Sequence, residues 1–545
     1  MAGMQSLGPM KDNARAMAIW AGENLPFPKA LSDKSAMRRR ARGCHLHNLW
    51  AMGKPVREAM AVREGRVRVV RFVTRLVLVL LVLAAGALAL RVVEVWRGPA
   101  LAPWHTYAAP EPEPSALDAM DWAGYLDAER QVFAGVAANV TARVPEAERT
   151  AQNRYFPGAR TYPGRFATDW NRSYEMLPDG AAKGAVVLVH GLTDSPYSLR
   201  HFARLYADRG FVVIGLRVPG HGTVPGGLTQ IRWEQWTAAV RLAVREARRL
   251  AGTDVPLHLV GYSNGGALAL LHTLDSLETP QIGRPAQVVL VAPMIGISPA
   301  ARFAGLAGLP ALLPGLDGAA WLDLLPEYNP FKYNSFPVHA AEQSYAVTQA
   351  LQQALTRQAD RLKDMPSVLT FQSVLDHTVS PEAVITDLHM RLPAGQSELV
   401  LFDINRAPEL DFVLDEASRT AMHRLVPGTS LPFRTVLVIA REDGEGMEAR
   451  IREANSEREA RQPLTLAYPP TVYSLSHVGM TFPVTDPLYG LQPDMSEEYG
   501  IRLGRALTWG ERGSMRVGPN TLMRLTSNPF LPYMLGRVGE RLPAQ

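Results

Sequence analysis

The chain has 545 residues, more than one average domain, and its 47% hydrophobic and 20% charged residues are typical of globular proteins. Its formal net charge is +5, but residues 1–75 carry an excess of ten positive charges, so the remaining 470 residues carry −5. This distribution argues against a nucleic-acid-binding surface on the main body. The single cysteine, Cys44, excludes an intrachain disulfide and a metal site built from cysteines.

Residues 1–68 are polar and basic and lack a clear hydrophobic period, so we expect a disordered segment. Translation from Met60, which begins MAVREGRVRVVRF, would remove most of this segment. The CHLH stretch at 44–47 resembles a metal-binding motif, but such a segment offers no framework for a metal site.

Residues 69–95 are predicted to be a transmembrane signal-anchor. Leu76–Leu90 contains 15 residues without a polar side chain, and its flank extends it to the ~20 residues that span a bilayer. Five arginines lie close to the stretch on its N-terminal side, at positions 63, 66, 68, 71 and 75. The positive-inside rule therefore predicts a single-pass protein of the cytoplasmic membrane, whose C-terminal part is extracytoplasmic. A signal peptide cleaved near ALA at 87–89 and a buried core helix are the alternatives.

The rest of the chain divides into a linker with a leading helix (96–171), a body (172–483) and a C-terminal extension (484–545). In the body, apolar strand-like stretches alternate with amphipathic helical stretches such as 233–252. The strand-like stretches are, in order, 184–191, 211–222, 257–263, 286–293, 367–381, 398–405 and 433–443. This alternation predicts an α/β fold with a mostly parallel, doubly wound sheet.

The stretch LHLVGYSNGGALAL contains a serine between glycines, at the end of an apolar run and before a helical one. A strand, then G-x-S-x-G, then a helix is the pattern of a nucleophile elbow, in which Gly261 and Gly265 permit a tight turn that exposes Ser263. An ordinary structural turn between a strand and a helix is the alternative interpretation. The N-terminal dipole of the following helix would favour a nearby anion.

A second loop follows the strand at 184–191. In hydrolases with a nucleophile elbow, such a loop presents a backbone N–H to a developing oxyanion. By position, we assign the two oxyanion-hole N–H groups to Leu192 and to Asn264, directly after the serine. The His190 side chain is expected to have only a packing role.

The stretches HGLTDSPYSLRHFARLYADRGFVVIGLRVPGHGT and GYSNGG resemble the α/β-hydrolase superfamily, most closely the monoacylglycerol lipase and carboxylesterase-like hydrolases. The similarity covers roughly 180–300, with patches near 367–381 and 470–483. It implies a serine nucleophile that acts with an acid and a histidine, in the chain order Ser, Asp, His. His221, in PGHG, falls in a loop that similar enzymes use for packing, and we do not expect it to be catalytic.

His477 is the predicted histidine, because it lies in a loop after a strand-like stretch and its type of side chain can accept and return a proton near neutral pH. His423 lies within a helical pattern and is the weaker candidate. Two acids follow strands, Asp376 in DHTVSP and Asp443 in RED. We favour Asp376, although it lies 101 residues before His477, whereas Asp443 lies only 34 before it.

Two regions elaborate the predicted body. A cap is expected at about 297–365, where leucines, alanines, prolines and aromatics would either form a lid over an acyl pocket or pack as helices on the sheet. An insertion at about 399–465 contains the strand-like FRTVLVIA and a predicted charged helix, GMEARIREANSEREARQ. No role is assigned to the extension at 484–545.

Together these patterns predict a membrane-anchored serine hydrolase that cleaves carboxylic esters with apolar acyl chains, using Ser263, Asp376 and His477. Neither a cofactor nor a metal is expected. The expected partners are a small-molecule or lipid ester and, through residues 69–95, the lipid bilayer. An acyltransferase, a thioesterase and a serine peptidase would use the same triad. An alternative of another class is a catalytically silent interaction protein of the cell envelope.

Overall fold

The computed structural model describes residues 54–296, 304–412, 414–426, 428, 430–442, 446–506 and 515–543. The chain divides into two units, Met1–Ala84 and Ala85–Gln545. Two candidates from the sequence, the CHLH stretch at 44–47 and the alternative acid Asp443, lie outside the described residues.

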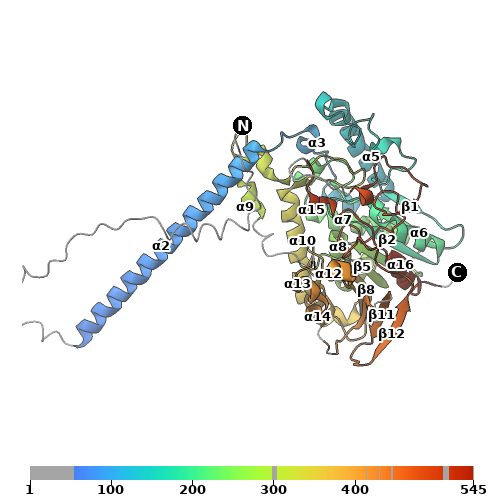
Figure 1. The fold of residues 1–545 in the computed structure, drawn as a ribbon. Coiled ribbons are helices and arrows are strands. Elements are labelled where there is room, and N and C mark those ends of the chain that lie inside the picture. The colour runs from blue at the N-terminus through green and yellow to red at the C-terminus, as the bar shows by residue number, and fades with distance from the viewer. Residues whose placement is uncertain are drawn as a thin grey trace, which may run out of the picture. The chain divides into compact units, whose positions relative to one another are not determined.

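The helix α2 runs over Lys54–Arg97 and is drawn in blue in Figure 1. Its part Arg68–Arg97 is long and apolar enough to cross a membrane: the most apolar 18-residue stretch within it has a mean hydropathy of 2.8 and is entirely unburied. The interpretation as a buried core helix is therefore wrong, whereas a cleaved signal sequence would have the same length and composition. The helix begins well before residue 69, because the residues after Pro55 are mostly good helix formers.

The second unit is built on a sheet with the strand order β1-β3-β2-β4-β5-β8-β9-β10-β11-β12. The strands from β3 to β10 in this order are parallel to their neighbours, while β1, β11 and β12 are antiparallel. The predicted mostly parallel sheet is confirmed. The strands are β1 Tyr174–Met176, β2 Gly184–Val189, β3 Phe211–Leu216, β4 Leu257–Tyr262, β5 Gln287–Val291, β8 Ser367–Ser373, β9 Ser397–Phe402, β10 Arg434–Ala440, β11 Met447–Arg452 and β12 Glu459–Leu464.

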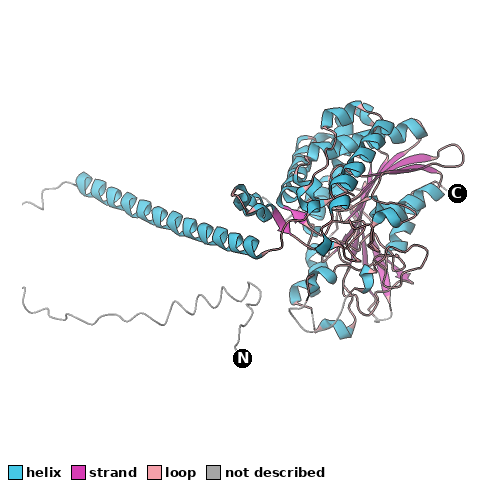
Figure 2. Ribbon diagram, turned by 90° about the horizontal axis from the view of Figure 1, so that it is seen from above, coloured by secondary structure: helices cyan, strands magenta, loops and turns pink. Residues whose placement is uncertain are grey.

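Helices pack on the two faces of this sheet (Figure 2). Alternate residues of β2 enter two separate cores: Val187 belongs to the core with α7 (Trp233–Ala251) and α8 (Asn264–Glu278), and Val186 to the core with α6 (Arg200–Asp208) and α16 (Leu531–Gly539). All six residues of β2 are buried. Strands buried on both faces read as continuous apolar runs, which is why GAVVLV could be recognised as a strand.

The segment before the sheet contacts the body rather than standing apart from it. It contains α3 (Pro103–Thr106), α4 (Pro114–Ala119) and α5 (Trp122–Asn139). The buried Arg217 guanidinium donates to the carboxylates of Glu111 (2.7 Å) and Glu129 (3.0 Å). Glu111, in the stretch expected to be a linker, is thereby fixed beside the loop that follows β3.

The cap region contains α9 (Ala304–Gly308), the small β6–β7 sheet (Trp321–Asp323 and Phe336–Pro337) and α10 (Val338–Arg357). Helix α10 lies along α8 (Figure 1) and buries Val347 and Leu351 in the core of that face. This part of the region therefore packs on the body. The described residues before it, 304–337, are the part that remains a candidate for the predicted lid.

The predicted charged helix at 446–462 is wrong. This stretch forms β11 and β12, an antiparallel hairpin with Asn455, at φ +56°, in its turn. Met447 and Ala449 are buried in the core beside β10, whereas the intervening Glu448 pairs with Arg450. The period of two along the apolar residues outweighed the helix propensity of the charged ones.

The C-terminal extension also packs on the body. Asp486 accepts from Arg200 Nη2 (2.5 Å), and both side chains are 0% exposed. Glu398 at the edge of β9 accepts from Arg537 and Arg541 of the last helical region, each at 2.7 Å. The remaining short helices are α11 Pro381–Ala383, α12 Pro408–Asp411, α13 Glu416–Arg419, α14 Ala421–Leu425 and α15 Pro519–Leu522.

Candidate active site

Ser263 lies in the sharp turn between β4 and α8 and has the unusual backbone angles φ +54° and ψ −118°. A non-glycine residue in this region costs on the order of 1–3 kcal/mol, which the surrounding contacts must offset. A Cβ on Gly261 would lie 2.5 Å from the Gly265 oxygen, and one on Gly265 would collide with the Val189 carbonyl. The two glycines thus allow β4, α8 and the end of β2 to approach closely enough to form the turn.

The structure brings Ser263, Asp376 and His477 together from three separate parts of the chain. Ser263 Oγ is 2.9 Å from His477 Nε2, and Asp376 Oδ2 is 2.7 Å from His477 Nδ1. All three residues are buried, with 6–8% of their surface exposed. This is a continuous hydrogen-bonded chain from a hydroxyl through an imidazole to a carboxylate.

The Asp376 carboxylate accepts three hydrogen bonds besides the one from His477. Oδ1 accepts from the backbone N–H groups of Thr378 (2.8 Å) and Val379 (3.1 Å), and Oδ2 also accepts from Gln372 Nε2 (3.1 Å). Burial alone would raise its pKa, but His477 and the two backbone N–H groups hold the pKa of Asp376 below its ordinary value. Because an ionised carboxylate can only accept, His477 Nδ1 carries a proton and Nε2 is left to accept from Ser263.

The loop after β2 lies directly against the serine. A Cβ on Gly191 would be 3.1 Å from the Cβ of Ser263, so the loop passes close to the serine at Gly191. Leu192 is the next residue of this loop. Asn264 is the first residue of α8, so its N–H has no carbonyl within its own helix to bind. The two backbone groups predicted for an oxyanion hole thus belong to segments that meet at Ser263.

The other histidines considered in the sequence are not part of this chain of hydrogen bonds. His190 Nδ1 donates to the Gly191 oxygen and Nε2 accepts from Val218 N, and burial lowers its pKa well below the ordinary value. These contacts agree with a packing role. His221 is buried beside Tyr333, with its pKa lowered by burial to about 3, and His423 is exposed on α14.

Several residues at the site were not found from the sequence. Tyr262 donates from its hydroxyl to the His477 carbonyl (2.9 Å) and stacks on the His477 ring, and Ser373 donates to the Leu475 carbonyl (3.0 Å). From the cap region, Tyr333 N donates to the Thr193 carbonyl (2.8 Å). Only the position of Tyr262 beside Ser263 could have suggested a role, because the other contacts join distant segments.

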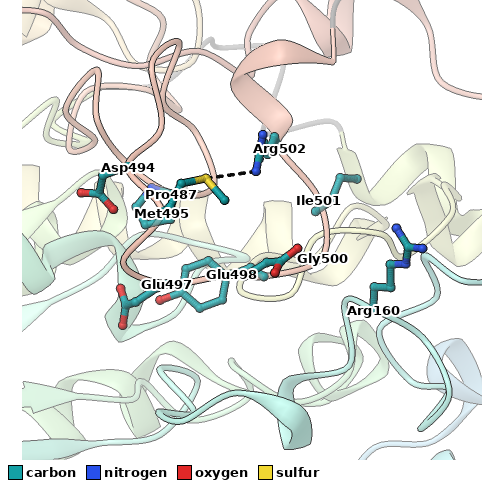
Figure 3. Close-up of a pocket in the computed structure, with 10 residues that line it drawn as sticks. Arg160, Pro487, Asp494, Met495, Glu497, Glu498, Gly500, Ile501 and Arg502 are labelled. Carbon is teal, nitrogen blue, oxygen red and sulfur yellow. Dashed lines mark hydrogen bonds between the residues drawn. The ribbon is translucent and has the colours of Figure 1, made fainter.

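A separate pocket of about 310 Å³ lies between the extension and the leading segment (Figure 3). Arg160, Glu498 and Arg502 line it, and Arg502 contacts Met495 Sδ at 3.1 Å. Ser263 and its partners do not line this pocket, so it is distinct from the candidate active site. Within the described residues, no group of three or more His, Cys, Asp or Glu side chains could hold a metal ion.

The parallel sheet, with a serine at the sharp turn after β4 and the loop after β2 beside it, defines an α/β-hydrolase fold. Residues 180–403 match the family model described as serine aminopeptidase, S33, of the hydrolase type. The resemblance expected from the sequence is thus confirmed: this region has the α/β-hydrolase fold and is similar to a monoacylglycerol lipase.

Individual relatives cover parts of the chain. A thermostable monoacylglycerol lipase of Bacillus sp. (strain H-257) is 34% identical over 85 residues, which are 16% of this chain and 33% of the relative. The chain thus matches about a third of the length of this curated relative. Among solved structures, a monoacylglycerol lipase of Paleococcus ferrophilus is 20% identical, with a TM-score of 0.31 and coverage of 46% and 97% of the two chains. A soluble variant of the Saccharomyces cerevisiae monoglyceride lipase is 15% identical, with a TM-score of 0.31. The match covers 42% of this chain and 81% of that one.

Proposed function

We propose that this protein is a membrane-anchored serine hydrolase that cleaves carboxylic esters with apolar acyl chains. The observation that carries the proposal is the hydrogen-bonded chain from Ser263 through His477 to Asp376. A hydroxyl held 2.9 Å from an imidazole, which is itself oriented by a carboxylate, is the arrangement that activates a serine for attack on a carbonyl.

In the proposed reaction, Ser263 Oγ attacks the ester carbonyl while its proton passes to His477 Nε2. The Asp376 carboxylate keeps Nδ1 protonated and stabilises the imidazolium that forms. The N–H groups of Leu192 and Asn264 donate to the oxyanion, each such donor being worth ~10²–10³ in turnover. His477 then protonates the departing alcohol, and water repeats the sequence on the acyl-enzyme to release the acid.

The choice of an ester with an apolar acyl chain has two supports. One is the similarity to a monoacylglycerol lipase. The other is the helix Arg68–Arg97, whose length and composition suit a membrane anchor and would hold the enzyme near lipid substrates. Peptide, thioester and acyl-transfer chemistry use the same three side chains, so the acceptor and the scissile bond require direct measurement.

A fluorophosphonate probe tests the proposal, because it phosphonylates only an activated serine. The wild-type protein should be labelled at Ser263, the Ser263→Ala variant should not, and the wild type should hydrolyse p-nitrophenyl esters in preference to aminoacyl p-nitroanilides. Ser276→Ala is the matched control, since this serine of α8 is buried and donates to the Thr273 carbonyl instead.

The result would contradict the proposal if folded wild-type protein were not labelled, or if Ser263→Ala were labelled equally. Either outcome would favour the catalytically silent interaction protein. Labelling at Ser263 together with preferred cleavage of aminoacyl anilides would retain the nucleophile and change the substrate class to peptides.

A further inference from the structure

The C-terminal extension reaches the two loops that carry Asp376 and His477. Arg524, in the segment after α15, contacts each of them. Its backbone carbonyl accepts from Ser476 Oγ at 2.8 Å, and its guanidinium Nη2 donates to Thr378 Oγ1 at 2.5 Å. One residue of the extension thus joins two loops that are about a hundred positions apart in the chain.

Each contact is made to a residue that shapes the local turn of a triad member. Ser476 directly precedes His477, and its hydroxyl also accepts from Gly479 N at 3.0 Å, which closes the turn around the histidine. Thr378 N donates to Asp376 Oδ1 at 2.8 Å. Arg524 therefore reaches His477 through one intervening residue, Ser476, and reaches Asp376 through another, Thr378.

The neighbouring residues hold this segment in place. Asn528 is 0% exposed; its N–H donates to the Phe482 carbonyl at 2.7 Å, and its Nδ2 donates to the Met480 carbonyl at 2.9 Å. A Cβ on Gly479 would collide with the Thr526 carbonyl. The chain from Arg524 to Asn528 thus runs beside the chain that follows His477, and these contacts hold the backbone next to Arg524 in place.

We propose that Arg524 is a positioning residue that sets the acid loop against the histidine loop, and so holds the Asp376–His477 hydrogen bond in its productive geometry. The inference rests on the proposed function. Misplacement of a reacting group by about 1 Å can cost ~10²-fold in rate. Loss of the contact that Arg524 makes between the two loops should therefore lower turnover. The extension at 484–545 thereby acquires a role in catalysis that its sequence did not suggest.

The test compares Arg524→Ala, Thr378→Val and the double variant on a short-chain p-nitrophenyl ester, with thermal unfolding measured in parallel. Thr378→Val removes the acceptor hydroxyl and keeps the N–H that binds Asp376. Each single variant should lower kcat by about 10- to 100-fold, with KM changed by less than about 2-fold. The double variant should be no slower than Arg524→Ala, because both remove the same contact. Arg524→Lys, which retains a donor and the charge, should recover part of the lost turnover.

Arg505→Ala is the matched control, since Arg505 is an exposed arginine of the same extension; it should retain wild-type kcat. Wild-type turnover in Arg524→Ala would overturn the inference, and so would effects of the two single variants that multiply in the double variant. If Arg524→Ala does not fold, wild-type kcat in folded Thr378→Val overturns it instead. If the wild type itself did not hydrolyse esters, that result would contradict the proposed function and not the role of Arg524.

Discussion

At the scale of single residues, Asp376 offers the sharpest test of the proposed triad. Its carboxylate accepts from His477 Nδ1, and its lowered pKa keeps it ionised at neutral pH. The change Asp376→Asn replaces an obligate acceptor by an amide and favours the wrong imidazole tautomer, so we expect turnover to fall by up to ~10⁴ while the fold survives. Ester hydrolysis under saturating substrate, with circular dichroism as the folding check, measures both.

Asp443→Asn is the companion variant, because Asp443 is the other acid that follows a predicted strand. We expect it to change turnover by less than about 2-fold, because the Asp376 carboxylate already accepts from His477 Nδ1. The reverse pattern, with Asp443→Asn inactive and Asp376→Asn active, would transfer the orienting role to Asp443.

At the scale of elements, the docking of the extension on α6 depends on a buried ion pair. Burial alone would raise the pKa of Asp486, but Arg200 and His201 hold that pKa well below its ordinary value. Arg200 has 0% exposure and stacks on Tyr197, so it cannot turn to solvent if its partner is lost. The pair therefore stabilises the native arrangement of α6 and the extension only while Asp486 is ionised.

The change Asp486→Asn should lower the free energy of unfolding at pH 7 by about 3–5 kcal/mol, because it leaves a buried guanidinium without its carboxylate. An acid whose pKa is depressed in the folded state contributes stability above its unfolded pKa and loses that contribution as pH falls through the folded pKa. The difference between wild type and variant should therefore be full above about pH 5 and shrink below about pH 4.

Urea unfolding at pH 7, 4 and 3 measures this difference. Glu498→Gln, at an exposed position of the same extension, is the control and should change stability by less than about 0.5 kcal/mol at each pH. A gap between Asp486→Asn and wild type that stays constant with pH would contradict the assignment of the acid-sensitive stability to this pair.

At the scale of the whole molecule, the proposed anchor predicts the side of the membrane on which the hydrolase region lies. The five arginines between positions 63 and 75 should keep the N-terminal end of Arg68–Arg97 in the cytoplasm. A reporter enzyme that matures only outside the cytoplasm, fused after residue 110, should therefore be active. The protein should also stay with membranes in a high-salt wash.

Activity of a cytoplasm-only reporter at the same fusion point would contradict the predicted topology. Release by salt of a product that begins near Leu90 would instead favour the cleaved signal peptide. As a control, substitution of the arginines at 68, 71 and 75 by glutamine should weaken the bias of the fusion toward the exported state.

The sequence by itself determined the features that depend on local pattern. The strand GAVVLV is apolar throughout because both of its faces are buried, and the glycines around Ser263 are required by a turn with no room for a Cβ. The apolar run from Leu76 to Leu90 could be recognised for the same reason, because its signal lies in consecutive residues.

Only the tertiary structure decided the features that depend on contacts between distant segments. It brought Asp376 to His477 across 101 positions, and it joined both loops to Arg524. It also overturned the helix predicted at 446–462, because pairing with β10 and burial of Met447 outweighed the local propensity of charged residues. Such long-range contacts leave no period in the sequence, so the partners of a side chain are known only once the chain has folded.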